Sequence, residues 1–432
     1  MKILILSQYW YPENGVPQRR WSWLTSVLEQ QGHEIVVLAP PPHYKRSVSL
    51  LEWLKARGYA SPQKGEIGPS GEYIQRTGYF PSGSSLTRRI FNQGWNALSM
   101  VSSLARRSGR LGEFHPDLVI GTVPALPTAA VTLFASARCS APYIIDLRDA
   151  WPALFKESES WNAGTGRPSL RERLFTRGPF QALVLTTENM LNIVLKRASG
   201  ILTTATELEA QVARDFDVPT ATVRNVFPSP EMRFSAPASN AAHEELRVLY
   251  AGTLGRAQKL ENALTAAKIA ESLGIKVSLR FVGDGATWDA LAARAEDLEV
   301  ELSLRHQRTP EQLFEDYEWA DTALVHLTQW ESLKVAVPSK TYELMSNGVH
   351  ITGVVQGEAA GLIKALKAGD VVEPNNPEAL AQLWGELARD RSRLLVPRNG
   401  RDWVCEQREV IAPESLARLI SKVVDGSEDS HA

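Results

Sequence analysis

Cysteine is scarce in this sequence, and neither sign of charge is in excess. The 432 residues include two cysteines, Cys139 and Cys405, which lie far apart and outside any CxxC or Cys/His pattern. We therefore expect reduced, buried thiols in a cytosolic chain and no disulfide framework or zinc site. The net charge is −2 and no long basic run occurs. These features argue against a nucleic-acid-binding protein.

Targeting and membrane-spanning patterns are also lacking. A short apolar run follows Lys2, but residues 9–20 are polar and no small-residue cleavage site follows. Residues 118–137 carry no charge, and twenty residues are long enough to span a bilayer. Gly121, Pro124 and Pro127 interrupt this run, so we interpret it as a buried strand, a turn and a buried helix. We expect a cytoplasmic protein.

Residues 88–110 predict an amphipathic helix with basic ends. Its apolar residues at helical spacing are Ile90, Phe91, Trp95, Leu98, Met100, Val101 and Leu104. Arg88-Arg89 precede them and Arg106-Arg107 follow. Two interpretations remain open: the helix packs on its own sheet, or it rests on the anionic inner face of the cell membrane.

The length of the chain predicts two domains, because single cores rarely grow beyond about 250–300 residues. Residues 2–39 have the strand–loop–helix–strand pattern of a parallel βαβ unit, and this plan begins again at Leu246. The intervening stretch lacks periodicity and is rich in Pro, Ser and Ala. We predict an N-terminal domain (1–230), a linker (231–245), a second domain (246–398), a C-terminal helical segment (399–425) and a disordered tail (426–432).

Two loops of the first domain follow buried strands, where parallel sheets bind ligands. Residues 11–20 follow the first strand and lack the GxGxxG spacing of dinucleotide sites, so a plain connection remains the alternative to a ligand loop. The strand at 143–145 leads to Asp146, Arg148 and Asp149. These charges form either a structural Arg–Asp pair or part of a catalytic cleft. In the cleft, Asp149 could orient or deprotonate an acceptor hydroxyl.

The stretch with the richest chemistry is VPSKTYELMSNG at 337–348, followed by GEAAGL at 357–362. A helix N-terminus suits a phosphate group, and Lys340 places a cation beside it. Glu343, three residues later, can accept hydrogen bonds from sugar hydroxyls. The combination predicts the nucleotide-sugar end of a glycosyltransferase.

Seven stretches spread over the chain resemble family 4 glycosyltransferases, in the branch that builds bacterial surface glycans and includes L-fucosamine-type transferases. They are YWYPENG with Gln18-Arg19, IIDLRDAWP, YAGTLGRAQKLENAL, FVGDG, VPSKTYELMSNG, GEAAGLI and AGDVVEPNNPEAL. The resemblance implies an α/β protein with the GT-B fold, in which two Rossmann-like domains face each other across a cleft. It also implies that the nucleotide sugar binds mainly to the second domain and that the C-terminal helix crosses back to the first.

The resemblance also assigns roles to single residues. The family motif has a Glu, seven residues and a second Glu, which holds the ribose hydroxyls. Glu343 matches the second Glu, whereas Val335 stands at the first position. A cation pair after the first strand of the second domain usually holds the diphosphate. Gln258 occupies one of those positions, which leaves Arg256 and Lys259 as candidates.

The resemblance and the local patterns together give three sets of predicted site residues. The donor-binding set is Gly15, Gly252, Arg256, Lys259, Gly283, Ser339, Lys340, Glu343, Gly357, Glu358 and Ala359. The acceptor-binding set is Tyr11, Glu13, Asn14 and Arg19, and the catalytic set is Arg148 and Asp149. We predict no metal ligands.

The predicted reaction moves a sugar from a nucleotide diphosphate sugar, a UDP-sugar, to a glycan, lipid-linked or small-molecule acceptor. No separate cofactor is expected. The resemblance implies retention of anomeric configuration without a required metal. Two alternatives stay open: a non-catalytic subunit that binds nucleotide or glycan, suggested by Val335, and a sugar-nucleotide epimerase, although the eight histidines form no obvious cluster.

Overall fold

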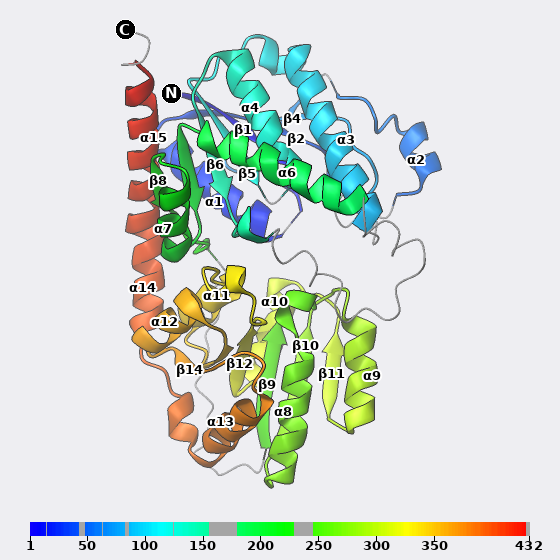
Figure 1. Ribbon diagram of the computed structural model, residues 1–432, viewed down its shortest axis with the longest axis vertical. Helices are drawn as coiled ribbons and strands as arrows, with labels where there is room; N and C mark the ends of the chain where they lie inside the picture. The colour runs from blue at the N-terminus through cyan, green and yellow to red at the C-terminus, as the bar shows by residue number, and fades with distance from the viewer. Residues whose placement is uncertain are drawn as a thin grey trace. The chain divides into compact units, whose positions relative to one another are not determined.

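The computed structural model describes residues 1–13, 15–42, 48–62, 64–82, 86–123, 125–154, 179–228 and 245–428. They form two compact units, drawn in Figure 1. The first unit takes the residues up to 154, residues 179–227 and the residues from 410 on, and the second takes the residues up to 409 that follow 227. Most of the predicted linker and the last residues of the predicted tail lie outside the described residues.

The first unit is built on an eight-stranded sheet in the order β3-β4-β2-β1-β5-β6-β7-β8. All neighbours pair in parallel except β3 with β4. The strands are β1 (Lys2–Leu6), β2 (Glu34–Ala39), β3 (Glu66–Ile67), β4 (Tyr73–Arg76), β5 (Leu118–Val123), β6 (Tyr143–Leu147), β7 (Gly200–Thr203) and β8 (Thr220–Thr222). Their apolar runs follow from burial on both faces of the sheet.

Helices cover both faces of this sheet. They are α1 (Val16–Gln30), α2 (Leu50–Lys55), α3 (Leu86–Ala105), α4 (Pro127–Cys139), α6 (Pro179–Lys196), α7 (Thr206–Asp215) and α15 (Ala412–Glu428), with the short η1 (Gly109–Gly112). Ile3 and Ile5 of β1 pack with α1 and α15 in one buried cluster. Gly121 of β5 faces α4, where a Cβ would lie 1.8 Å from Thr132 Oγ1.

The last helix of the chain belongs to the core of the first unit. Leu416, Leu419, Ile420 and Val423 of α15 are buried in the cluster that contains β1 and α1. Their spacing places them on one helical stripe, as expected for a helix that packs on a sheet. In Figure 1, α15 is the red helix.

The uncharged run at 118–137 forms β5 and α4, as the sequence pattern predicted. Among the described residues, no helix combines the length and apolar character needed to cross a membrane. The amphipathic helix predicted at 88–110 forms α3, which buries Met100 and Leu104 but exposes Phe91 and Leu98. The two cysteines are free, as expected, but both are half-buried rather than buried, because each lies near the end of a helix at the surface.

The second unit has a parallel six-stranded sheet in the order β11-β10-β9-β12-β13-β14. The strands are β9 (Glu245–Ala251), β10 (Lys276–Val282), β11 (Leu302–Arg305), β12 (Thr322–His326), β13 (Ile351–Val354) and β14 (Gly369–Val372). The helices are α8 (Glu261–Ser272), α9 (Trp288–Leu298), α10 (Pro310–Trp319), α11 (Ser339–Asn347), α12 (Gly357–Ala365), α13 (Pro377–Arg389) and α14 (Asn399–Glu406). Shorter turns are η4 (Arg256–Gln258), η5 (Glu331–Leu333), η6 (Arg391–Leu394) and the π-helical η7 (Gln407–Ile411).

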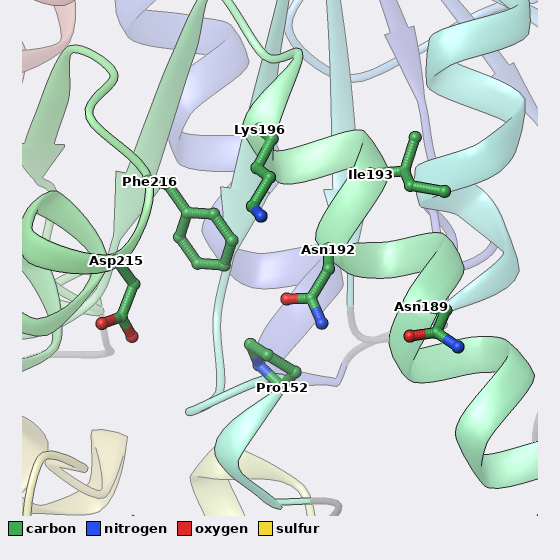
Figure 2. A pocket seen from close by; sticks show the side chains of 7 residues that line it. All are labelled: Pro152, Asn189, Asn192, Ile193, Lys196, Asp215 and Phe216. Atoms are coloured by element: carbon green, nitrogen blue, oxygen red, sulfur yellow. The ribbon is translucent and has the colours of Figure 1, made fainter.

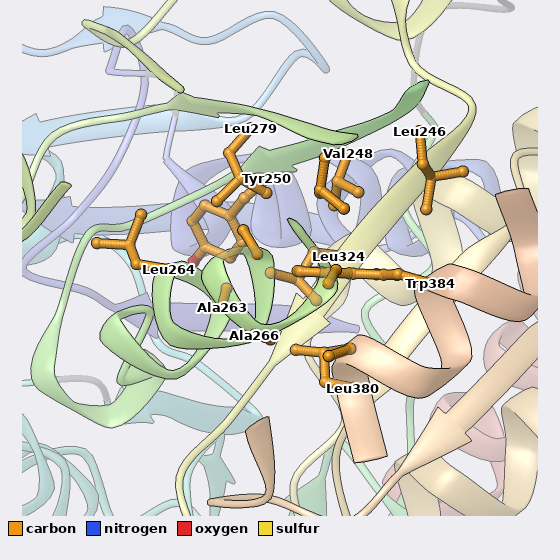
Figure 3. Close-up of a cluster of buried hydrophobic side chains, with 14 of the residues drawn as sticks. Leu246, Val248, Tyr250, Ala263, Leu264, Ala266, Leu279, Leu324, Leu380 and Trp384 are labelled. Carbon is orange, nitrogen blue, oxygen red and sulfur yellow. The ribbon is translucent and has the colours of Figure 1, made fainter. Parts of the chain in front are cut away.

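The core of the second unit lies between its sheet and the pair α8 and α13. Figure 3 shows Val248 and Tyr250 of β9 among these buried side chains, with Trp384 of α13 reaching into the cluster. Trp384 is fully buried. Because α8 and α13 cover this face, the loops at the carboxyl ends of the strands are held at one edge of a rigid layer.

Candidate active site

Two glycine-containing loops meet at the carboxyl edge of the second sheet. The Gly252 N–H, just after β9, donates to the Val282 carbonyl at 2.9 Å. Gly283 follows β10 with φ +157°, and a Cβ there would lie 1.7 Å from the Gly252 carbonyl oxygen. Only glycine allows this approach. The sequence predicted both glycines as donor-binding residues, and the structure places them together.

The two candidate cations after β9 lie in and beside the short turn η4. Arg256 starts η4 and is partly buried. Lys259 follows η4 in the left-handed region, with φ 40°, and its Nζ donates to Asn375 Oδ1 at 2.9 Å. The Thr328 N–H, just after β12, donates to the Ala257 carbonyl at 2.7 Å and fixes the turn against the next strand. The predicted pair therefore stands on one anchored loop.

His326 lies beneath this loop and is not among the site residues predicted from the sequence. Its Nε2 is 3.1 Å from Asn262 Nδ2 in α8. Burial lowers the pKa of the imidazole to about 3; a hydrogen bond with the Gln258 backbone opposes this effect, and the charge of Lys259 adds to it. The ring is therefore neutral at physiological pH and supports the loop as a buried polar group. A single histidine at the end of a strand gave no sequence pattern by which to find it.

Glu343 and Lys340 lie one turn apart on α11. Lys340 Nζ is 2.9 Å from Glu343 Oε1, and the Tyr317 hydroxyl donates to the same oxygen at 3.1 Å. The side chain of Glu343 is 13% exposed and that of Lys340 is 26% exposed. The sequence predicted both residues of the pair, but it gave no indication that Tyr317, 26 residues earlier, would contact Glu343.

Local sequence explains the bounds of α11. Pro338 precedes its first residue, Ser339, and Gly348 ends it in the left-handed region with φ 67°. The Val349 N–H reaches back to the Leu344 carbonyl at 3.1 Å, which closes the last turn. Ser339 therefore stands at the helix start, as predicted.

The third predicted segment, Gly357 to Ala359, starts α12. Gly357 has φ +59°, and a Cβ there would lie 2.0 Å from the Lys334 carbonyl oxygen. The Glu358 N–H donates to that same carbonyl at 3.1 Å. The Glu358 amide is therefore engaged within the protein, and a phosphate group would have to displace this bond in order to use it. Glu358 and Ala359 are both buried.

In the first unit, part of the predicted acceptor-binding set lies in the loop after β1. Tyr11 is 47% exposed, and its carbonyl accepts a hydrogen bond from Arg76 Nη2 at 2.5 Å. Glu13 Oε2 accepts from Gln18 Nε2 at 3.2 Å. Asn14 lies outside the described residues.

The same loop runs into α1. Gly15 precedes the helix, and its carbonyl accepts from the Arg19 N–H at 2.9 Å. The guanidinium of Arg19 lies over the Phe227 ring, 4.5 Å from its centroid. A cation stacked on an aromatic ring is held in one orientation. Gly15 and Arg19 thus lie on adjacent turns at one end of α1.

The buried Arg–Asp pair of this sheet involves Arg20 and Asp146. Arg20 Nη2 is 2.9 Å from Asp146 Oδ1, and both side chains are fully buried. The Trp21 indole N–H also donates to Asp146, at 2.8 Å to Oδ2. Asp146 is therefore satisfied without Arg148. The structural pairing that remained open for the three charges is made by Asp146, inside β6, with Arg20 from α1.

Arg148 and Asp149 are left at the carboxyl end of β6. Within the described part of the chain, Arg148 Nε and Nη1 are buried and have no hydrogen-bond partner. Burial lowers the pKa of the guanidinium to about 10, Asp146 opposes this, and Arg20 lowers it further, so Arg148 remains charged at neutral pH. Two buried guanidinium nitrogens without hydrogen bonds are costly, which is typical of a group that awaits a ligand.

Asp149 lies beside this cation and is exposed to solvent. Desolvation by the surrounding protein raises the pKa of its carboxyl, whereas the charge of Arg148 lowers it and that of Asp146 raises it. Because the residue is exposed, water screens these effects. Asp149 can therefore act as a hydrogen-bond acceptor or a base for a hydroxyl group that reaches this edge.

The predicted residues thus fall into two groups, each at the carboxyl edge of its own sheet. The first unit holds Tyr11, Glu13, Gly15, Arg19, Arg148 and Asp149, and the second holds Gly252, Arg256, Lys259, Gly283, Ser339, Lys340, Glu343, Gly357, Glu358 and Ala359. No cluster of three or more His, Cys, Asp or Glu side chains that could hold a metal ion occurs among the residues that the structure describes.

A depression of about 740 Å³ lies on the first unit, outside both groups. Its lining residues are Pro152, Asn189, Asn192, Ile193, Lys196, Asp215 and Phe216. Figure 2 shows Asn192 and Lys196 on α6, with Phe216 opposite and Pro152 below. None of the predicted site residues lines this depression.

Residues 232–402 match the family model described as Glycosyl transferases group 1. The match spans nearly all of the second unit and includes every predicted donor-binding residue except Gly15. The chain is a glycosyltransferase with the GT-B fold. No curated protein sequence matches it.

Solved structures share this fold over nearly the whole chain. Sucrose-phosphate synthase from Thermosynechococcus elongatus is 13% identical with a TM-score of 0.67, covering 98% of this chain and 99% of that one. HepE from Anabaena, in complex with UDP and glucose, is 14% identical with a TM-score of 0.62, covering 98% and 99%. WaaG, a glycosyltransferase involved in lipopolysaccharide biosynthesis, is 14% identical with a TM-score of 0.60, covering 97% and 99%. At these identities the likeness concerns the fold.

Proposed function

We propose that this glycosyltransferase moves a sugar from a UDP-sugar to a glycan, lipid-linked or small-molecule acceptor, with retention of anomeric configuration and without a required metal. The observation that carries the proposal is the oriented Glu343 carboxylate on α11, in the same unit as the loop of Arg256 and Lys259. All three residues lie in the segment that matches the glycosyltransferase family model.

In the proposed donor complex, Glu343 accepts hydrogen bonds from the ribose hydroxyls. A carboxylate can accept from two neighbouring hydroxyls, and bonds to a charged acceptor are stronger than those between neutral groups. The choice of UDP is supported by HepE from Anabaena, a protein of the same fold that was solved with UDP and with UDP-glucose.

The diphosphate would lie against the loop after β9. Bond cleavage at the anomeric carbon leaves negative charge on the diphosphate, and nearby cations lower the energy of that state. Arg256 and Lys259 supply such cations from one anchored turn. The helix start at Ser339 adds backbone N–H groups, and at the start of α12 the Glu358 N–H would first have to leave the Lys334 carbonyl. Gly15 remains a donor-binding prediction from the sequence.

The acceptor would use the first unit. We assign the acceptor hydroxyl to Asp149, with Arg148 as its charged neighbour, because Arg148 Nε and Nη1 lack partners among the described residues. Tyr11, Glu13 and Arg19 remain the proposed contacts to the rest of the acceptor, together with Asn14 from sequence alone. The family 4 branch that builds surface glycans, with L-fucosamine-type members, is part of this proposal and rests on the sequence motifs.

Peripheral contact with the inner face of the cell membrane extends the proposal. Phe91 and Leu98, seven residues apart on one stripe of α3, are 58% and 68% exposed. The exposed Arg88 and Arg106 lie at the two ends of this helix. Apolar side chains flanked by cations suit an anionic lipid surface. Leu98→Ser should reduce co-sedimentation with phosphatidylglycerol vesicles, and equal binding of both proteins would contradict the contact.

The test of the donor site is Glu343→Gln, which keeps the size of the side chain and removes its charge. We expect the Kd for UDP, measured by calorimetry, to rise at least about tenfold, because charged hydrogen bonds contribute roughly 1.5–3 kcal/mol each. The matched control is Glu318→Gln, an exposed glutamate on α10. Unchanged UDP binding in Glu343→Gln would overturn the ribose assignment.

The non-catalytic subunit remains the second candidate, because Val335 stands where the family motif has its first Glu. Such a subunit would bind UDP but release no UDP from any UDP-sugar. Measuring UDP release therefore separates the two functions.

A further inference from the structure

The Glu343 carboxylate is held by two donors that meet on one oxygen. Lys340 Nζ lies 2.9 Å from Oε1, and the Tyr317 hydroxyl lies 3.1 Å from the same atom. Lys340 Nζ also lies 5.9 Å from the centroid of the Tyr317 ring. The three side chains therefore form one contact group that joins α10 to α11, and the position of the carboxylate depends on both helices.

Tyr317 is the more rigid of the two donors. It is 1% exposed, whereas the Lys340 side chain is 26% exposed and has four rotatable bonds of its own. A buried hydroxyl that donates to a carboxylate forms a charge-assisted bond in a region of low dielectric constant. A long, partly exposed lysine holds a partner less firmly, because it loses more rotamer freedom.

The helix that carries Tyr317 is itself fixed. Its start is closed by a capping box in which Thr309 and Gln312 exchange hydrogen bonds between side chain and backbone. The fully buried Asp316, next to Tyr317, accepts from Arg280 at 2.9 Å and from Arg305 at 2.7 Å. These anchors come from β10 and β11. They tie α10 to the sheet, and this fixes the position from which the Tyr317 hydroxyl donates.

We propose that Tyr317 is a positioning residue for donor recognition: its hydroxyl orients the Glu343 carboxylate toward the ribose hydroxyls of the nucleotide. Lys340 completes the same arrangement as the charged partner of the carboxylate. The proposal rests on the proposed function, because it requires that Glu343 binds ribose. The buried Asp316 with its arginines is the support for α10.

The direct test is Tyr317→Phe, which removes the hydroxyl and keeps the buried ring. The probes are UDP and 2′-deoxy-UDP, with Kd values measured by calorimetry on the full chain. For the wild type we expect UDP to bind about tenfold more tightly than 2′-deoxy-UDP, because the analogue leaves one acceptor of Glu343 unpaired. In Tyr317→Phe this preference should fall to about threefold or less, with weaker UDP binding.

The control is Tyr143→Phe in the first unit. Tyr143 is also a buried tyrosine, and its hydroxyl donates to the Val194 carbonyl at 2.6 Å, so the loss of a buried hydroxyl bond is matched. This variant should keep the wild-type preference. A full preference for UDP in Tyr317→Phe, together with its loss in Glu343→Gln, would overturn the role of Tyr317 and leave the proposed function standing. Equal binding of the two probes to the wild type would overturn both.

Discussion

At these sheet edges, the charge and the hydrogen bonds of single side chains depend on partners that are distant in sequence. Asp146 is satisfied by Arg20, which lies 126 residues earlier, and this leaves its neighbour Arg148 without that partner. His326 is neutral because it is buried, and its ring contacts α8 through Asn262. The role of each charged residue therefore depends on its neighbours, because a neighbour that is paired with another opposite charge is not available to it.

Arg148 and Arg20 give a paired prediction, because one guanidinium lacks a partner for Nε and Nη1 within the described residues and the other is fully paired. Arg148→Met should leave the free energy of unfolding unchanged or raise it by about 1 kcal/mol, since it removes a buried guanidinium whose Nε and Nη1 make no hydrogen bond among the described residues. It should also lower the turnover of the sugar donor by at least about tenfold, because the charged neighbour of Asp149 is lost.

Arg20→Met is the comparison variant. It should lower the free energy of unfolding by about 3–5 kcal/mol, because Asp146 is then buried without a cation. Urea denaturation of both variants measures the difference. If Arg148→Met lost as much stability as Arg20→Met, Arg148 would be a structural residue and its place in the candidate site would be wrong.

At the scale of helices and strands, the site depends on short anchored connections. Gly252 and Gly283 let two loops touch, and Gly357 lets the start of α12 approach the Lys334 carbonyl. A side chain on Gly283 or Gly357 would collide with backbone, and one on Gly252 would meet the Tyr250 hydroxyl. The left-handed Gly357, with φ +59°, also adopts a conformation that other residues reach only with strain. These glycines fix the distance between neighbouring loops.

The periodicity of the sequence was sufficient to predict most helices and strands of the second unit. The alternation of apolar runs and helical stripes from Leu246 onward predicted the strands and helices of the second sheet, because each parallel strand is buried on both faces. The contacts between elements could not be predicted in the same way. The Tyr317 hydroxyl reaches Glu343 only because the fold brings these two side chains of α10 and α11 into contact, and no local pattern records that contact.

At the scale of the whole molecule, two cores are each closed by helices, and the chain returns to its first core at the end. The stripe of Leu416, Leu419 and Ile420 on α15 packs with β1 and α1, the first elements of the sequence. A helical segment near the C-terminus was predicted from the sequence, and the resemblance implied its return. The partners of that stripe lie some 400 positions earlier, beyond the reach of a local pattern.

Transfer of a sugar from a UDP-sugar bound to the second unit is the central proposal. Its most direct test is a turnover screen of the purified full chain with UDP-, GDP-, dTDP- and ADP-sugars, in which release of the nucleoside diphosphate is measured beside thermal stabilisation by each nucleotide. We predict stabilisation by UDP and slow release of UDP from one UDP-sugar, with both effects reduced in Glu343→Gln. Stabilisation by no nucleotide and release from no sugar donor would contradict the account.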